Sequence, residues 1–205
     1  MTIWAIVPVK PLWLGKSRLS GVLSDDERAV LNRMFLEQTL DILRAIPSVT
    51  QTLVVSRDPA ALAIAREFGA RTVLEDGTPN LNSALNRATM LAKNHAPRGV
   101  LVLPADLPLL TQDDLLEFFD HVCEPPCMVI TPDRHELGTN ALLMAPGGLI
   151  PYDFGLGSFT RHCESAKSLG AKLTIVRNKH IELDLDTPDD LALLKQIEQS
   201  KPQGE

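Results

Sequence analysis

A run of four apolar residues that ends in a carboxylate between two prolines constrains this chain most. The run is Val100-Leu-Val-Leu103, and Pro104-Ala-Asp-Leu-Pro108 follows it directly. Its β-branched valines favour a strand that is buried on both faces, and the prolines prevent a helix from following. In open α/β sheets, ligands bind at the carboxyl ends of the strands. We therefore expect Asp106 to be a metal ligand at such an edge. The alternative is that it caps the next helix, although Thr111 already offers a cap there.

Strand-like and helix-like segments alternate along the chain. Apolar runs predict strands at residues 3–9, 52–56, 71–75, 100–103, 127–131, 140–144, 172–176 and 182–184. Capping residues and helical periodicity predict helices that begin after Ser24, Asp58, Asn80 or Asn82, Thr111, Ser158 and Thr187. This alternation predicts an α/β fold with one mostly parallel central sheet and helices on both of its faces.

The composition is that of one domain of ordinary size. The chain has 205 residues, of which 44% are hydrophobic and 22% charged, and it is long enough to bury a core without disulfides. We expect a single domain over residues 1–199 and a flexible tail over residues 200–205. Surplus apolar residues in the 140s would allow a homodimer.

Charge and cysteine content exclude several classes of partner. A net charge of −6, with no block of Lys and Arg, argues against nucleic-acid binding. No run of about 18 apolar residues is present that would cross a membrane. The three cysteines lack paired spacing, which predicts reduced thiols, and the start of the chain has no signal-peptide pattern. We therefore expect a cytoplasmic protein.

The loop after the first predicted strand gathers positive charge. Lys10, Lys16 and Arg18 lie in it, although the chain as a whole is acidic. The segment Gly15-Lys-Ser17 suggests a P-loop, but that motif needs a glycine where Lys10 stands, and Pro11 stiffens the loop. We reject a P-loop and expect the cations to meet a triphosphate at the ligand-binding edge. The alternative is a solvated basic loop that pairs with nearby acids.

Two aspartates near the C-terminus share one side of an extended segment. In Asp184-Leu-Asp-Thr-Pro188, alternation places both carboxylates on the same side, about 6 to 7 Å apart. Mg²⁺ binds through one or two carboxylates plus substrate phosphate oxygens, so Asp106 with either aspartate would suffice. An aspartyl-phosphatase signature also contains Asp-x-Asp, but Pro188 stands where that signature needs threonine. The other alternative is that Asp186 or Thr187 merely caps the last helix.

Two small-residue loops offer backbone amides to an anion. They are Gly138-Thr-Asn140 and Phe154-Gly-Leu-Gly-Ser158. Ser158 would cap the helix that follows, and so would add a hydroxyl and the positive end of a helix dipole. A phosphate or carboxylate group would fit there. The alternative is that the glycines serve only turn geometry and that His162 lies on the helix surface.

Several segments occur in an order that is specific as a set. They are Val7-Pro-Val-Lys10, Gly15-Lys-Ser-Arg-Leu-Ser20, Ala105-Asp-Leu-Pro108, Gly138-Thr-Asn-Ala-Leu142, Phe154-Gly-Leu-Gly-Ser-Phe159 and Asp184-Leu-Asp-Thr-Pro188. Asp-x-Asp or Gly-Lys-Ser alone is common, but the ordered set spans nearly the whole chain. With this set the chain resembles the 2-phospho-L-lactate guanylyltransferase family of coenzyme F-420 biosynthesis.

The resemblance implies a Rossmann-like nucleotide-diphospho-sugar transferase fold and a reaction. GMP would pass from GTP to the phosphate of a small phosphorylated carboxylic acid, which is 2-phospho-L-lactate, phosphoenolpyruvate or 3-phospho-D-glycerate in this family, and pyrophosphate would leave. The implied nucleotide-binding residues are Lys10, Lys16, Ser17, Arg18 and Asn82, the acceptor-binding residues are Thr139, Gly155 and Ser158, and the Mg²⁺ ligands are Asp106, Asp184 and Asp186. The catalytic roles fall to Lys16, Arg18 and Asp106. Asn80 stands where the guanine-side segment of the family has glycine, so the chain departs from the family pattern on the side that selects the base.

Two other functions fit parts of the pattern. A molybdenum-cofactor-type nucleotidyltransferase shares the fold and the metal chemistry, but its first loop contains a Gly-x-x-x-Arg-Met run that is absent here. A non-catalytic nucleotide-binding domain would need no converging acids. The sequence does not name the acceptor, because the shape of the pocket depends on several loops together.

Overall fold

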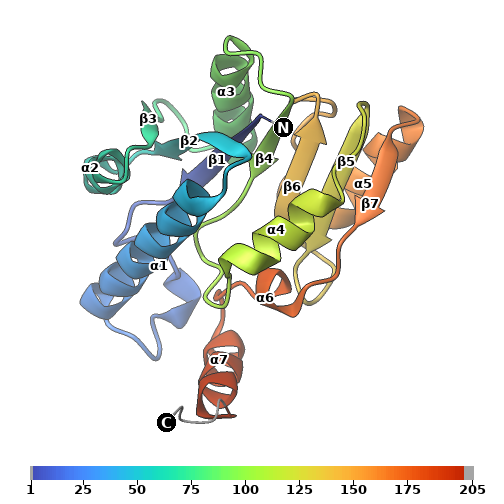
Figure 1. Ribbon diagram of the computed structural model, residues 1–205. Coiled ribbons are helices and arrows are strands. Elements are labelled where there is room, and N and C mark those ends of the chain that lie inside the picture. Colours follow the sequence, from blue (N-terminus) through green and yellow to red (C-terminus); the bar gives the residue numbers. More distant parts are fainter. Residues whose placement is uncertain (1, 201–205) are drawn as a thin grey trace.

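A single sheet with the strand order β3-β2-β1-β4-β6-β5-β7 organises the computed structural model, which describes residues 2–200 (Figure 1). The strands are β1 (Ile3–Val9), β2 (Val49–Ser56), β3 (Arg71–Leu74), β4 (Gly99–Val102), β5 (Cys127–Pro132), β6 (Thr139–Ala145) and β7 (Lys172–Ile175). Strand β6 runs antiparallel to β4 and β5, and the other neighbouring strands pair in parallel. The predicted mostly parallel sheet is confirmed.

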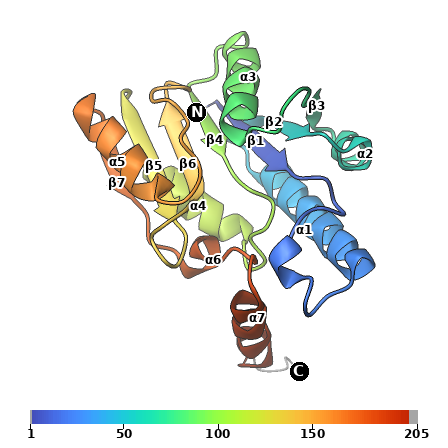
Figure 2. The same ribbon diagram turned by 180° about the vertical axis from the view of Figure 1, so that it is seen from behind.

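Helices cover both faces of this sheet, as the alternation predicts. They are α1 (Asp25–Ala45), α2 (Pro59–Glu67), α3 (Leu81–Lys93), α4 (Gln112–Asp120), α5 (Ser158–Ser168), α6 (Lys179–Glu182) and α7 (Pro188–Ser200), with a 3-10 turn η1 (Ser17–Leu19) in the first loop. Figure 1 shows α1 and α4 in front of the sheet, and the reverse view in Figure 2 brings α3 and α5 forward. The side chains of α1, α2 and α4 pack into one core cluster, and those of α3 and α5 pack into another on the opposite face.

Strand β4 lies in the middle of the sheet and is buried on both faces. Val100, Leu101 and Val102 have no exposed surface. Leu101 joins the cluster with α1 and α4, whereas Val100 and Val102 join the cluster with α3 and α5. The apolar run therefore forms the buried central strand that its sequence predicts, and Asp106 lies just beyond its carboxyl end.

A third, smaller cluster joins the C-terminal segment to the first loop. Leu19 of η1, Phe35 of α1, Leu185 and Leu194 of α7 pack together there. In Figure 1, α6 and α7 lie below the sheet, with α6 under α4 and α7 beside the loop that precedes α1. The cluster brings residues from both ends of the chain to the edge where β1 and β4 finish.

The strand predicted at 182–184 is wrong. Helix α6 occupies the chain up to Glu182, and it begins where the side chain of Asn178 caps its N-terminus, accepting hydrogen bonds from the backbone N–H of His180 at 2.9 Å and of Ile181 at 3.3 Å. The residues after α6 are extended but pair with no strand of the sheet within residues 2–200. Leu183 and Leu185 are nevertheless buried, and Leu185 packs against Leu19, Phe35 and Leu194.

Helix starts settle the other open choices. Asn80, rather than Asn82, caps α3, because its Oδ1 accepts from the backbone N–H of Ser83 at 2.9 Å. Thr187, rather than Asp186, begins α7 through reciprocal hydrogen bonds with Asp190. Ser158 is not a cap: the cap residue of α5 is Gly157, which has a left-handed φ of 77°, and no side chain caps this helix.

Three further predictions concern the whole chain. The described helices include none that is long and apolar enough to cross a membrane. Cys123, Cys127 and Cys163 are all free, as the sequence predicts. The tail expected at residues 200–205 falls outside the described residues, apart from Ser200, which ends α7.

The central position of β6 yields a stability prediction. Leu143 is fully buried between Leu101 of β4 and Val129 of β5. We expect Leu143→Ala to lower the free energy of unfolding by about 2–5 kcal/mol, because the cavity left behind cannot collapse inside a paired strand. Urea denaturation measures this, with Leu169→Ala as the control, since Leu169 is 57% exposed and should change stability by less than about 1 kcal/mol. Equal losses in both variants would contradict the assignment of the core.

Candidate functional site

A cavity of about 480 Å³ opens at the edge where β1, β2 and β4 end and β6 begins. Its lining includes Lys10, Lys16, Asp106, Thr139, Gly155, Ser158, Asp184 and Asp186. These residues come from four distant parts of the sequence, and most of the residues expected to form the site are among them. The sequence therefore predicts correctly that the acids, the basic loop and the small-residue loops share one edge of the sheet.

Three of the expected residues do not line this cavity. Arg18 forms an ion pair with Asp186, with 2.7 Å between Nη1 and Oδ2. Ser17 is exposed at the start of η1. The amide of Asn82 is occupied by the backbone of Phe154: its Oδ1 accepts from the N–H at 2.8 Å and its Nδ2 donates to the carbonyl at 3.2 Å. Asn82 thus anchors the Phe154 loop to α3.

The first loop is held in place by polar side chains of the neighbouring helices. Asp58, the cap of α2, accepts a hydrogen bond from the backbone N–H of Leu12 at 2.9 Å. On α1, Asn32 donates to the carbonyl of Leu12 at 2.6 Å, and Arg28 donates to the carbonyl of Gly15 at 3.1 Å. The loop is therefore preorganised even though it contains little regular structure.

Lys16 is buried at the junction between this loop and the C-terminal acids. Its backbone is left-handed, with φ of 58°, which is uncommon for a residue other than glycine and points to a functional constraint. Its Nζ donates to the carbonyl of Leu185 at 2.6 Å and lies 3.8 Å from Oδ2 of Asp106. Burial lowers the pKa of Lys16, while the charges of Asp106, Asp186 and Asp184 act in the opposite direction.

The acidic segment runs alongside the end of β4. The backbone N–H of Leu185 donates to the carbonyl of Asp106 at 3.0 Å. Leu183 and Leu185 are buried, whereas Asp184 and Asp186 lie on the cavity side. The alternation expected from the sequence is present, although the segment is not a strand of the sheet.

The carboxylates of Asp106 and Asp184 repel one another. Burial, together with the negative charge of Asp106, raises the pKa of Asp184 to about 6. The amide of Asn140 partly offsets this by donating to Oδ1 of Asp184 at 3.3 Å. A cation placed between Asp106 and Asp184 would relieve the repulsion, because an opposite charge favours the ionised form.

The donor set fits Mg²⁺ bound together with substrate. Within residues 2–200, no three His, Cys, Asp or Glu side chains form a ready metal cluster. Mg²⁺ does not require one, because it is commonly held by one or two carboxylates with water and substrate phosphates. Asp106 and Asp184, whose charges destabilise each other, offer carboxylate oxygens of this kind.

Two hydroxyl groups also line the cavity. Oγ1 of Thr139 lies 3.1 Å from Oγ of Ser158 and 3.1 Å from Nδ1 of His162. His162 has no exposed surface, so the alternative that it lies on the helix surface is wrong. Gly155 and Gly157 both have positive φ, of 134° and 77°, which lets the loop turn tightly into the N-terminus of α5. A helix N-terminus favours an anion, and the backbone N–H of Ser158 itself donates to the carbonyl of Gly155 at 3.0 Å.

Sequence reasoning missed the polar side chains that support the site. Besides Asp184, Asn140 binds the carbonyls of Ile181 and Glu182 at 3.0 and 3.1 Å, and so holds the acidic segment against β6. Asp133 accepts hydrogen bonds from three backbone N–H groups of the loop up to Gly138. Asn140 lies inside one of the sequence motifs, and His162 lies three residues after another. A polar residue within an element that is predicted to be buried is the sequence signal that could have identified them.

The chain is similar along nearly its whole length to known nucleotidyltransferases. The family described as guanylyl transferase CofC like matches residues 3–198. The phosphoenolpyruvate guanylyltransferase of Rubrobacter xylanophilus is 40% identical over 195 residues, which cover 95% of this chain and 94% of that protein. The 2-phospho-L-lactate guanylyltransferase of Methanothermobacter thermautotrophicus is 32% identical over 192 residues, which cover 93% of this chain and 83% of that protein.

Solved structures show the fold. A protein of Desulfovibrio desulfuricans G20 described as a nucleotide-diphospho-sugar transferase superposes with a TM-score of 0.76 at 16% identity, over 98% of this chain and 90% of that one. A 4-diphosphocytidyl-2C-methyl-D-erythritol synthase superposes with a TM-score of 0.65, also at 16% identity, over 96% of this chain and 97% of that one. The fold is that of the nucleotide-diphospho-sugar transferases, as expected.

The buried histidine yields a pH prediction. Burial lowers the pKa of His162 to about 4, below the value of about 6.5 expected in the unfolded chain. The unfolded state therefore binds more protons between these values, so His162 should stabilise the fold fully above about pH 6.5 and lose up to about 3 kcal/mol as the pH falls to 4. Asp184, with its raised pKa, contributes the opposite slope over part of this range.

Comparing the wild type with a His162 variant separates the contribution of His162 from that of Asp184. Urea denaturation of the wild type and of His162→Gln at several pH values should give a difference in unfolding free energy that shrinks as the pH falls. A difference that is independent of pH would mean that His162 is not buried in its neutral form.

Proposed function

The chain belongs to the family described as guanylyl transferase CofC like and is a nucleotidyltransferase, and from this premise we propose that it transfers GMP from GTP to a small phosphorylated carboxylic acid. Pyrophosphate is the other product. The relatives are named for phosphoenolpyruvate and 2-phospho-L-lactate, and we include 3-phospho-D-glycerate among the candidate acceptors. The reaction belongs to the biosynthesis of coenzyme F-420.

One observation carries the proposal. Asp106, Asp184 and Asp186 line the same cavity as Lys10 and Lys16, and Thr139 and Ser158 line it as well. A bound cation would offset the repulsion between the aspartates, and a bound anion would pair with the two lysines. A nucleoside triphosphate with its metal supplies both, and the hydroxyl-lined wall leaves room for a second anion.

The chemical step requires little general-base catalysis. An oxygen of the acceptor phosphate attacks the α-phosphorus of GTP in line, a new P–O bond forms, and the bond between the α-phosphorus and the bridging oxygen of the pyrophosphate breaks. The acceptor phosphate is already ionised near neutral pH, so positioning and charge stabilisation dominate. Lys10, Lys16 and Arg18 offset the charge that develops on pyrophosphate.

Lys16 and Arg18 contribute differently to this step. Lys16 is fixed by Leu185 and Phe35, whose ring centroid lies 5.3 Å from Nζ. The side chain of Arg18 is 71% exposed, so its surface ion pair with Asp186 is weak and exchangeable. Lys16 is thus a preorganised charge, whereas Arg18 is free to leave Asp186 for a phosphate.

Mg²⁺ is the cofactor that we propose for the acidic wall. Asp106 and Asp186 would hold it, with Asp184 as a further ligand, and the ion would supply charge neutralisation for the triphosphate. The raised pKa of Asp184 supports this, because a nearby divalent charge would restore its ionised form.

The acceptor lies against Thr139, Gly155 and Ser158 in this proposal. The N-terminus of α5 favours negative charge, and the two hydroxyls offer hydrogen bonds to a carboxylate or phosphate. Asn82 contributes to the nucleotide side only indirectly, through the Phe154 loop. The cytoplasmic location and the homodimer expected from the sequence remain predictions, as do the absence of nucleic-acid and membrane partners.

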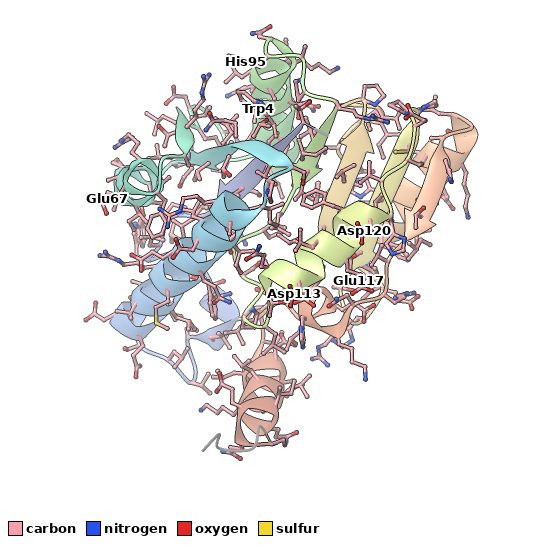
Figure 3. All side chains as sticks on the ribbon, viewed as in Figure 1. Trp4, Glu67, His95, Asp113, Glu117 and Asp120 are labelled. Carbon is pink, nitrogen blue, oxygen red and sulfur yellow. The ribbon has the colours of Figure 1, made fainter. Side chains whose placement is uncertain are left out.

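Removing the charge of Asp106 tests the site. We expect Asp106→Asn to lower kcat/KM by about 100-fold to 1,000-fold with GTP, Mg²⁺ and acceptor, because transition-state charge is no longer offset. The fold should be retained, since the Asp106 side chain is 40% exposed. The matched control is Asp120→Asn, on the outer surface of α4 in Figure 3, which should stay within about 2-fold. A near-normal rate in Asp106→Asn would refute the assignment.

Product analysis tests the reaction itself. The protein is incubated with Mg²⁺, GTP and each of the three acceptors in turn, and the products are weighed by mass spectrometry. We expect pyrophosphate and one GMP-acceptor adduct with at least one acceptor. Free phosphate released from an acceptor without GTP would indicate a phosphatase, and GTP binding without turnover of any acceptor would indicate a non-catalytic domain. Turnover that is absent with the three acceptors and appears when a molybdenum cofactor precursor replaces them would support that alternative transferase.

A further inference from the structure

His162 contacts Thr139, which pairs with Ser158 to form the hydroxyl wall of the cavity, but His162 is not among the residues that line the cavity. Its ring is fully buried and contacts the ring of Phe154 edge-on, with centroids 5.0 Å apart. Nε2 lies 3.1 Å from the backbone nitrogen of Asp153, and Nδ1 lies 3.1 Å from Oγ1 of Thr139. Both ring nitrogens are therefore engaged, one by the Phe154 loop and one by β6.

These contacts fix the position of the proton on the ring. A backbone N–H can only donate, so Nε2 of His162 must accept the hydrogen bond from Asp153. Because the ring is neutral at physiological pH, its single proton then resides on Nδ1. Nδ1 must donate to Oγ1 of Thr139.

Counting protons shows what this tautomer does for the cavity. Thr139 and Ser158 together own two hydroxyl protons, and their mutual hydrogen bond of 3.1 Å uses one of them. Since the proton in the hydrogen bond between His162 and Thr139 comes from Nδ1 of His162, the second hydroxyl proton is not used in that bond. No other partner for either hydroxyl exists within residues 2–200, and both residues line the cavity. With the opposite tautomer, Thr139 would donate to Nδ1, Ser158 would donate to Thr139, and no proton would remain.

We infer that His162 is a positioning residue that, by donating to Thr139, leaves one hydroxyl proton of the Thr139–Ser158 pair directed at an anionic group of the acceptor. The inference rests on the proposed function, whose acceptor side it deepens. The same ring also anchors the Phe154 loop through Asp153. Acceptor binding should therefore depend on the donor at Nδ1, whereas GTP binding should not.

Two amide variants separate the two sides of the ring. In His162→Asn, the shorter amide reaches the position of Nδ1 and can still donate to Thr139. In His162→Gln, the longer amide reaches the position of Nε2 and can still accept from Asp153, but Thr139 loses its donor. We expect Gln to raise KM for the acceptor by about 10-fold to 100-fold, the worth of one hydrogen bond to a charged group. Asn should recover most of this loss.

The controls exclude a general loss of structure. KM for GTP should stay within about 2-fold in His162→Gln, which keeps the acceptor for Asp153, and exposed His121, as His121→Gln, should change neither constant. Equal effects of Asn and Gln on the acceptor KM, or an equal rise in the KM for GTP, would overturn the inference.

A spectroscopic readout stands apart from activity and from mutagenesis. Nitrogen-15 correlation spectra of the imidazoles in the wild-type protein should show His162 as the neutral tautomer with its proton on Nδ1. A proton on Nε2 would overturn the inference even if both variants failed to fold. If no acceptor is turned over at all, the proposed function fails. The spectra would still show whether Nδ1 of His162 carries the proton, and hence whether Thr139 and Ser158 retain a hydroxyl proton for a ligand.

Discussion

The site depends on one buried ammonium group that joins the two ends of the chain. Lys16, from the loop after β1, donates to the carbonyl of Leu185 and lies beside Asp106 at the end of β4. An unpaired ammonium in this position would be costly, because burial penalises its charge. The acids at 106, 184 and 186 therefore stabilise Lys16, and Lys16 in turn makes their proximity tolerable.

The positive charge of the lysines does not fully offset the negative charge of the aspartates in the cavity. Asp106, Asp184 and Asp186 share the cavity with Lys10 and Lys16, and the pKa of Asp184 is raised to about 6. A structure that served stability alone would replace such a cluster with apolar residues at little cost. The residual negative charge is the feature of a site that binds a cation with its substrate, as in other phosphoryl-transfer enzymes.

Polar side chains other than the proposed catalytic and metal-binding residues hold the loops of the site in place. Asp58 and Asn32 hold the basic loop, Asn140 holds the acidic segment, and Asn82 holds the Phe154 loop. Each uses a side chain to satisfy backbone groups of an irregular segment, which would otherwise be buried without partners. Preorganisation of this kind lowers the reorganisation needed when charge develops during the reaction.

The sequence by itself determined the alternation of strands and helices, the buried strand that ends before Asp106, and the period of two that turns Asp184 and Asp186 to one side. These follow from local patterns of apolar and capping residues. Only the tertiary structure decided that Asn82 binds a loop, that Ser158 pairs with Thr139 and does not cap α5, that residues 182–184 leave the sheet, and that His162 is buried. The reason is physical: the same polar side chain satisfies a local backbone group or a distant one equally well, and the choice depends on which partner the packed fold brings within hydrogen-bond distance.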